Sequence, residues 1–131
     1  CSSRLMTVST IGEAFPLHCL ASGKAMLAAM PDEQVMKLLG EKPLKSHTAN
    51  TISDVKLVIA ELEKIRKSQI AHDREEHLEG VSAVGVAIQE PGGKLYAISI
   101  PVPTVRFRKK QKDLIKALKE CRAQILSEIE S

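Results

Sequence analysis

The sequence predicts a single α+β domain in which helices flank an antiparallel sheet. Three observations lead to this prediction: a β-branched hairpin lies in the second half, helical patterns stand on both sides of it, and 131 residues fit one domain. Hydrophobic residues make up 44% of the chain and charged residues 27%, which is ordinary usage for a domain with a buried core.

The first third of the chain predicts one short strand and two helices. Residues 4–9 alternate between two faces, as a strand does. Residues 21–29 are rich in Ala and Leu and favour a helix. Pro31 ends it and begins a second helix over residues 32–39, which Gly40 stops.

The middle of the chain predicts a longer helix and then a loop. We expect Thr51 or Ser53 to cap this helix, because residues 51–54 match a capping box. Residues 72–80 are too charged for a core strand and favour a loop. The apolar positions of the helix recur at helical spacing; they are Val55, Val58, Ile59, Leu62 and Ile65.

The second half predicts a hairpin and a terminal helix. Residues 81–88 are apolar, and few polar residues interrupt them, which is typical of a strand covered on both faces. A Pro-Gly-Gly turn at residues 91–93 leads into a second strand over residues 94–102. The tail carries an apolar stripe opposite Lys and Glu; its members are Leu114, Leu118, Cys121, Ile125 and Ile129.

Composition argues against membrane and nucleic-acid partners for this chain. No run of 18 apolar residues occurs, so no membrane span is expected. The formal net charge of +3 is too mild to indicate nucleic-acid binding. A basic stretch either contacts phosphate or forms a solvated loop before the last helix, and the lack of interleaved aromatics favours the loop. It comprises Arg106, Arg108, Lys109, Lys110 and Lys112.

The cysteine pattern bears on disulfides, zinc ribbons and the redox compartment. They stand at positions 1, 19 and 121, an odd number without a C-x-x-C spacing, so they favour neither a disulfide framework nor a zinc ribbon. The simplest location is then the reducing cytoplasm. No cofactor motif is present. Ligand type alone leaves a metal site open at four side chains, which are His18, Cys19, His72 and His77.

Residues 16–25 hold the strongest candidate for a ligand site. Ala21, Ser22 and Gly23 are small and run directly into a helix, so a ligand can approach the backbone closely. A helix start presents free N–H groups and the positive end of the helix dipole, which together suit a carboxylate. The alternative is a plain N-cap formed by Ser22. A phosphate-binding loop is not indicated, because no Ser or Thr follows Lys24.

Catalysis is not predicted. Carboxylates and His77 cluster within residues 73–81, where acid–base work would be conceivable, but clustered loop charges are usually solvated. Ser22 lacks the G-x-S-x-G turn of hydrolases. A small metal-dependent hydrolase built on Ser22, Asp73 and His77 stays as an alternative.

Several short blocks resemble, in order and at similar spacing, the signature of the IclR family of transcription regulators. Each block alone is weak, whereas together, from about residue 8 to residue 107, they are specific. The blocks are residues 17–25 (LHxTAxGKA), 47–54 (TpnTItd), 62–73 (eLxxvRxxGyaxD), 73–81 (DxEExxxGV) and 84–107 (the closing strands with sxsgPxxRf).

The resemblance implies a GAF-like or profilin-like sensor domain with a small-molecule pocket on one sheet face. In the family this domain follows an N-terminal winged helix-turn-helix, so DNA would be contacted only through that absent part. The chain begins near a segment that resembles a middle strand of the family's sheet. Residues 1–131 are therefore expected to form one effector-binding and oligomerisation domain, truncated at its N-terminal edge and with a smaller sheet, unless the first 20 residues compensate.

The resemblance also implies where the pocket lies. Ala83 stands where members often have Cys, and Pro101-Val102 replaces a Ser-Gly pair, which favours a ligand with one carboxylate and an apolar body. Pro101 also removes a ladder donor, so the strand is expected to end there or become an edge. The pocket positions carried over are Ala21, Ser22, Gly23, Asp73, Val81, Ala83, Ser99 and Pro101.

The expected function is therefore effector sensing without catalysis. A small organic acid is the expected ligand, and a homodimer or homotetramer the expected assembly. Asp73 is expected either to accept a hydrogen bond from a ligand hydroxyl or water, or to pin its loop by bonding the backbone. A bare oligomerisation module is the alternative.

Overall fold

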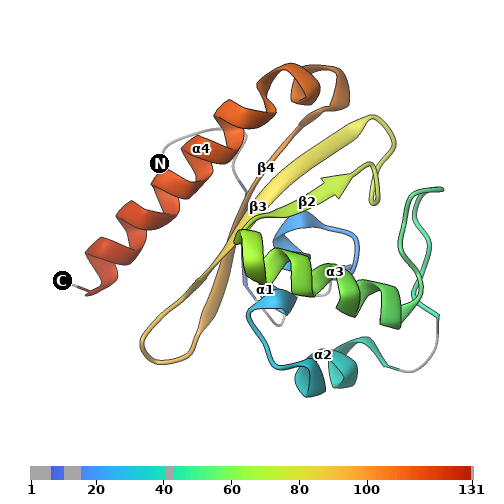
Figure 1. Cartoon of the computed structure of the whole chain (residues 1–131), viewed down its shortest axis with the longest axis horizontal. Coiled ribbons are helices and arrows are strands. Elements are labelled where there is room, and N and C mark those ends of the chain that lie inside the picture. The colour runs from blue at the N-terminus through green and yellow to red at the C-terminus, as the bar shows by residue number, and fades with distance from the viewer. Residues whose placement is uncertain (1–6, 11–15, 41–42, 131) are drawn as a thin grey trace.

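The computed structural model describes residues 7–10, 16–40 and 43–130. The four strands form one antiparallel sheet in the order β1-β4-β3-β2 (Figure 1). The predicted α+β class, with helices flanking an antiparallel sheet, is confirmed. The elements are β1 (Thr7–Thr10), α1 (Ala21–Ala28), α2 (Asp32–Leu39), α3 (Val55–Ser68), β2 (Ala71–Arg74), β3 (Val81–Gln89), β4 (Leu95–Pro103) and α4 (Thr104–Glu130).

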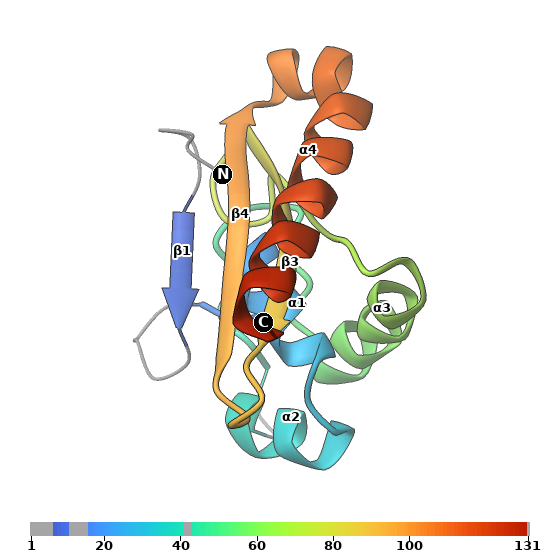
Figure 2. The same cartoon turned by 90° about the vertical axis from the view of Figure 1, so that its left-hand side faces the viewer.

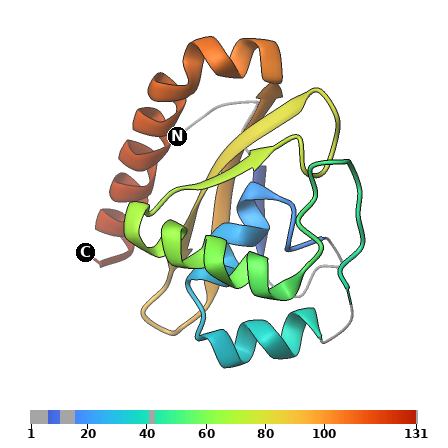
Figure 3. The same cartoon turned by 45° about the vertical axis from the view of Figure 1, so that its right-hand side comes forward.

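The sheet separates two layers of helices. The long helix α4 crosses one face, whereas α1 and α3 cover the other, with α2 beyond them (Figure 3). The strand β1 lies beside β4 at the opposite side of the sheet from β2 (Figure 2). Because β3 is covered on both faces, it has the nearly continuous apolar sequence that predicted such a strand.

The two sheet faces differ in the size of their side chains. Bulky residues of β3 and β4 pack against Leu118 and Phe107 of α4; they are Val84, Val86, Ile88, Ile98, Ile100 and Val102. On the other face the small residues Ala71 and Ala97 pack against Met26 and Leu27. This face therefore lets α1 approach the strands closely.

The side chain of Arg66 fixes the far end of α1. It reaches from α3 and donates to the carbonyl oxygens of Ala28 at 2.9 Å and Met30 at 3.0 Å. It also pairs with Asp32 at 2.8 Å. Helix C-termini leave carbonyls unbonded, so a guanidinium is a suitable partner there.

Two predictions for the start of α3 and the following loop are wrong. Asp54, and not Thr51 or Ser53, caps α3, because its carboxylate accepts the N–H of Lys56 at 2.9 Å. Residues 72–74, expected in a loop, belong to β2, where Asp73 is buried and Arg74 exposed. Their charges are accommodated because one face of this short strand turns toward polar partners.

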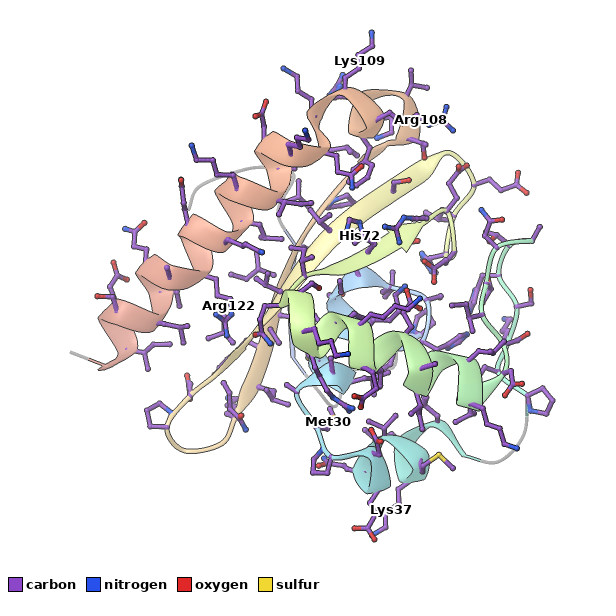
Figure 4. The ribbon with its side chains drawn as sticks, viewed as in Figure 1. Met30, Lys37, His72, Arg108, Lys109 and Arg122 are labelled. Carbon is purple, nitrogen blue, oxygen red and sulfur yellow. The ribbon has the colours of Figure 1, made fainter. Side chains whose placement is uncertain are left out.

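The basic stretch at residues 106–112 does not form a loop. It lies in the first turns of α4, where Arg108 and Lys109 project outward (Figure 4). All five of its basic side chains are exposed. The prediction that these charges are solvated is confirmed, and only the backbone conformation was wrong.

Of the two outcomes expected at Pro101, an end of the strand or an edge position, the first is wrong. The pairing Ala83↔Pro101 continues to Val81↔Pro103. Within the described residues β1 pairs with β4 only as far as Ser99, so Pro101 has one neighbouring strand there. A proline is tolerated in such a position because its missing N–H deprives no partner.

The described cysteines differ in state. Cys19 is a buried free thiol. Cys121 is disulfide-bonded, which the odd number of cysteines did not predict.

No helix in the described part of the chain combines the length and apolar character needed to cross a bilayer.

Candidate functional site

The start of α1 lies directly on the sheet at Gly85. A Cβ atom on Gly85 would come within 2.9 Å of the Ala21 carbonyl carbon and 3.1 Å of the Ser22 nitrogen. Only glycine permits so close an approach. Gly85 pairs with Ser99 on β4, and directly paired residues share one sheet face. The first turn of α1 therefore faces the surface that carries Ser99.

The first-turn amides of α1 have no capping partner. The N-cap residue is Leu20, which has no side-chain cap bond, and the first turn contains no acidic residue. The first amide bonded along the helix is that of Lys24, to the Leu20 carbonyl at 2.9 Å. Ser22 is thus inside the helix, and its interpretation as a plain N-cap is wrong. Among the described residues, nothing accepts from the amides of positions 21–23.

Two serines belong to this part of the fold: Ser22 lies in the same turn of α1, and Ser99 lies on β4, paired with Gly85. Ser22 is 4% exposed and Ser99 is 6% exposed. In the part of the chain that the structure describes, neither hydroxyl has a hydrogen-bond partner. Neither hydroxyl oxygen is among the buried side-chain atoms that lack a partner, so each keeps some contact with solvent. The site therefore combines unbonded backbone amides with two hydroxyl groups that can donate, which is an arrangement suited to an anion.

Gly23 lies against the backbone of Leu17. A Cβ atom there would lie 2.5 Å from the Leu17 carbonyl oxygen and 2.6 Å from the Leu17 Cα. Its lack of a side chain is therefore required by the preceding turn of the chain. The expectation that Gly23 is small so that a ligand can approach needs this correction, because only its amide is available to a ligand.

The other predicted residues lie on the same sheet face. Asp73, Ala83 and Pro101 form one row across β2, β3 and β4, next to the row of Gly85 and Ser99. Val81 lies at the far end of β3, paired with Pro103. The structure thus brings the predicted sheet positions onto the face that α1 covers. None of three cavities that the described residues bound is lined by a predicted pocket residue, although one of them reaches Gly85, so the predicted site rests on its donors and not on a cavity.

Asp73 pins the turn that follows β2. Its Oδ1 accepts the N–H of Glu76 at 2.8 Å. Burial raises the pKa of this carboxyl to about 6, against the lowering effect of the Glu76 and His77 amides and of Lys24. Of the two roles expected for Asp73, this geometry supports the pinning of the backbone.

A buried ion network ties α1 to α3 and to the β2–β3 turn. The ammonium of the fully buried Lys24 bonds both carboxylate oxygens of Glu76 at 2.9 Å and one oxygen of Glu61 at 3.0 Å. Glu76 also accepts the N–H of Arg74 at 3.0 Å. Sequence reasoning missed this network. The available clue was a lysine in a helix of otherwise small and apolar residues.

The four side chains at which ligand type left a metal site open are only partly together. His72 lies on the opposite sheet face, with its ring edge-on to Phe107 at 6.3 Å between centroids. Burial, with the charges of Arg74 and Lys24, lowers the pKa of His72 to about 4. His47, which the sequence did not single out, instead joins His18 and Cys19, and the ligand atoms of these three lie within 4.8 Å of one another.

Cys19 is not a reactive nucleophile in this environment. Burial, reinforced by the charges of Asp73 and Glu76, raises the pKa of its thiol to about 12. A thiol reacts as its thiolate, so a protonated thiol at neutral pH is inert.

Replacing Asp73 by Asn should change how stability depends on pH. Since the folded pKa of about 6 exceeds the ordinary 3.8, the folded state binds more protons between pH 4 and 6 and loses stability as pH rises through that window. Asp73→Asn removes this loss. The free energy of unfolding of the variant, relative to that of the parent, should therefore rise by on the order of 2 kcal/mol from pH 4 to 7, at about 1.36 kcal/mol per pKa unit.

Urea unfolding at several pH values measures this gain. His72 acts in the opposite sense, because its lowered pKa makes stability rise between pH 4 and 6.5. The difference between variant and parent removes that contribution. A difference independent of pH would show that Asp73 titrates in its ordinary range.

Comparison with known proteins agrees with the architecture. The family model "Bacterial transcriptional regulator IclR C-terminal" matches residues 1–127. The HTH-type transcriptional regulator Rv1719 of Mycobacterium tuberculosis is 45% identical over 115 residues, which cover 88% of this chain and 44% of that protein. The chain thus spans less than half the length of this relative.

Solved structures show the same fold. The IclR protein of Thermotoga maritima matches with a TM-score of 0.79 and 34% identity, over 88% of this chain and 47% of that one. The inducer-binding domain of the PobR transcription factor from Acinetobacter, solved as a double mutant with 3-hydroxybenzoic acid, matches with a TM-score of 0.67 and 25% identity, over 82% and 66% of the two chains.

Proposed function

The chain belongs to the IclR family of bacterial transcription regulators, as their C-terminal domain, and on that premise we propose that it senses a small organic acid bound at the start of α1. The observation that carries the proposal is the group of free donors there: three backbone amides and the hydroxyls of Ser22 and Ser99. A hydrogen bond to a charged group contributes roughly 1.5–3 kcal/mol, and the helix dipole up to about 2 kcal/mol when partly buried.

The expected ligand has one carboxylate and an apolar body. Ala83 and Pro101 present apolar surface in the row next to Ser99, whereas Asp73 is engaged with its own turn. An apolar body would lie on that surface while the carboxylate takes the amides. The 3-hydroxybenzoic acid of the PobR complex belongs to this chemical class.

Ligand binding is proposed to act through assembly. An acid that favours one arrangement of a homodimer or homotetramer shifts the population toward it and so alters the spacing of attached DNA-binding domains. DNA recognition then belongs to a winged helix-turn-helix outside this chain. The chain itself catalyses no reaction, and it works in the cytoplasm, where its operator lies.

A thermal-shift panel of benzoates, short aliphatic acids and glyoxylate tests the proposal. We expect an aromatic or aliphatic monocarboxylate to stabilise the parent more than glyoxylate does. Ser99→Ala and Ser22→Ala should each weaken that acid about tenfold, because each loses one bond to a charged group. The matched control is Ser82→Ala, a buried serine of β3 that faces α4 and bonds Thr104.

The outcomes separate the alternatives. If an acid binds both serine variants as tightly as it binds the parent, its site lies elsewhere. If no acid stabilises the chain while sedimentation shows a persistent dimer, the chain is a bare oligomerisation module. Turnover of a chromogenic ester that Ser22→Ala abolishes would indicate the hydrolase.

A further inference from the structure

We propose that His18, Cys19 and His47 form a binding site for a divalent transition-metal ion of the zinc type. The site lies where the chain enters α1, and it goes beyond effector binding without depending on it. Each residue offers one ligand atom, and these atoms lie within 4.8 Å of one another. Residues from two segments far apart in the sequence therefore converge on one point.

The separation of the ligand atoms is close to that of a metal site. Tetrahedral zinc, with bonds of about 2.0–2.1 Å to nitrogen and 2.3 Å to sulfur, holds its ligand atoms roughly 3.3–3.7 Å apart. The remaining difference of about 1 Å is within the reach of side-chain rotation. His47 is exposed and so has room to turn, whereas His18 and Cys19 are buried and fixed.

The donor set selects the kind of metal. Two imidazoles and one thiol suit zinc and its neighbours, whereas magnesium and calcium require oxygen ligands. Cys19 is a free thiol, and it would bind the ion as its thiolate, with the thiol proton released to solvent. Among the residues that the structure describes, no carboxylate oxygen joins this set of three ligands.

His18 already has the outer hydrogen bond typical of a metal-bound histidine. Its Nε2 lies 2.7 Å from the carbonyl oxygen of Lys45. A carbonyl can only accept, so the proton is on Nε2 and the lone pair on Nδ1. Such a bond fixes the tautomer and the ring orientation of coordinating histidines.

The loop that carries His47 is held in place by threonines. The amide of His47 donates to the Thr51 hydroxyl at 3.0 Å. Thr51 and Thr48 in turn donate to the carbonyl oxygens of Glu76 and Glu75, each at 2.5 Å. The backbone of this loop is thus set by the fold before any ion arrives, which reduces the ordering cost of binding.

The three donors leave a fourth tetrahedral position open. The His77 ring lies 5.3 Å from the His47 ring between centroids, and the His18 ring lies 5.8 Å from it on the same measure. The fourth ligand is therefore His77 or a water molecule. Comparing His77→Gln with the parent distinguishes these two cases without affecting the main proposal.

Titration of chelator-treated chain with Zn²⁺, and with Co²⁺ as a coloured substitute, tests the site. We expect one ion per chain and a sulfur-to-cobalt charge-transfer band. Cys19→Ala should remove the band, and His47→Gln should weaken the affinity by at least about tenfold. His72→Gln is the matched control, because His72 lies on the opposite sheet face. Mg²⁺ should not bind.

Two results would overturn the proposal. One is the absence of Zn²⁺ binding to the parent chain. The other is binding that His47→Gln and Cys19→Ala leave unchanged, which would mean that the ion sits elsewhere. Because His47 is exposed, its substitution tests the site even if Cys19→Ala impairs folding.

Discussion

Lys24→Met should lower the free energy of unfolding by about 3–5 kcal/mol, the usual cost of removing one partner from a buried ion pair. Methionine fills a similar volume, so little packing is lost. The Glu76 carboxylate, however, is left buried with its ammonium partner gone, and Glu61 loses the same partner. Urea unfolding at pH 7 measures the loss.

The controls identify the cause. Lys37→Met removes an exposed lysine of α2, which projects into solvent (Figure 4), and should change stability by less than about 0.5 kcal/mol. The double variant Lys24→Met/Glu76→Gln should recover part of the loss, since it removes the uncompensated charge. If Lys24→Met behaves like Lys37→Met, the network does not hold the fold.

Gly23→Ala should destabilise the domain by about 3 kcal/mol, the upper end of the cost of overpacking. The added methyl would lie 2.5 Å from the Leu17 carbonyl oxygen, and the neighbouring atoms are all backbone. A side chain could rotate away from such a contact, but the backbone of the turn must shift as a whole. Thermal and urea unfolding measure the effect.

Gly92→Ala is the matched control for the glycine substitution. No atom lies within 4 Å of a Cβ at Gly92, in the hairpin turn. The change there should be within about 1 kcal/mol of zero, and slightly stabilising if the unfolded chain loses entropy. Equal effects at the two glycines would contradict the close approach of Leu17 to α1.

Elements with local patterns could be predicted from the sequence. The hairpin was recognisable because its two apolar runs surround Gly92 and Gly93, and α2 because Pro31 and Gly40 mark its ends. The strand β2 could not be recognised, because Asp73 and its neighbours carry charges that only tertiary partners accommodate. A pattern within one segment contains no information about such partners.

The candidate site shows the same limit. The small residues before Lys24 predicted a helix start, but the N-cap at Leu20 depends on where the turn meets the sheet. The network of Lys24 could not be predicted, because its partners Glu61 and Glu76 lie 37 and 52 residues away. His47 was likewise overlooked, since its neighbours His18 and His77 are brought to it only by the fold.

The helix α1 is attached to α3 at both of its ends. Near its start Lys24 is bonded to Glu61, and at its end the carbonyl of Ala28 accepts from Arg66. The two helices are therefore expected to move as one rigid unit. A displacement of the first turn of α1 must either break these bonds or move α3 with it. Motion begun beside the sheet is thus delivered to the outer surface of the helical layer.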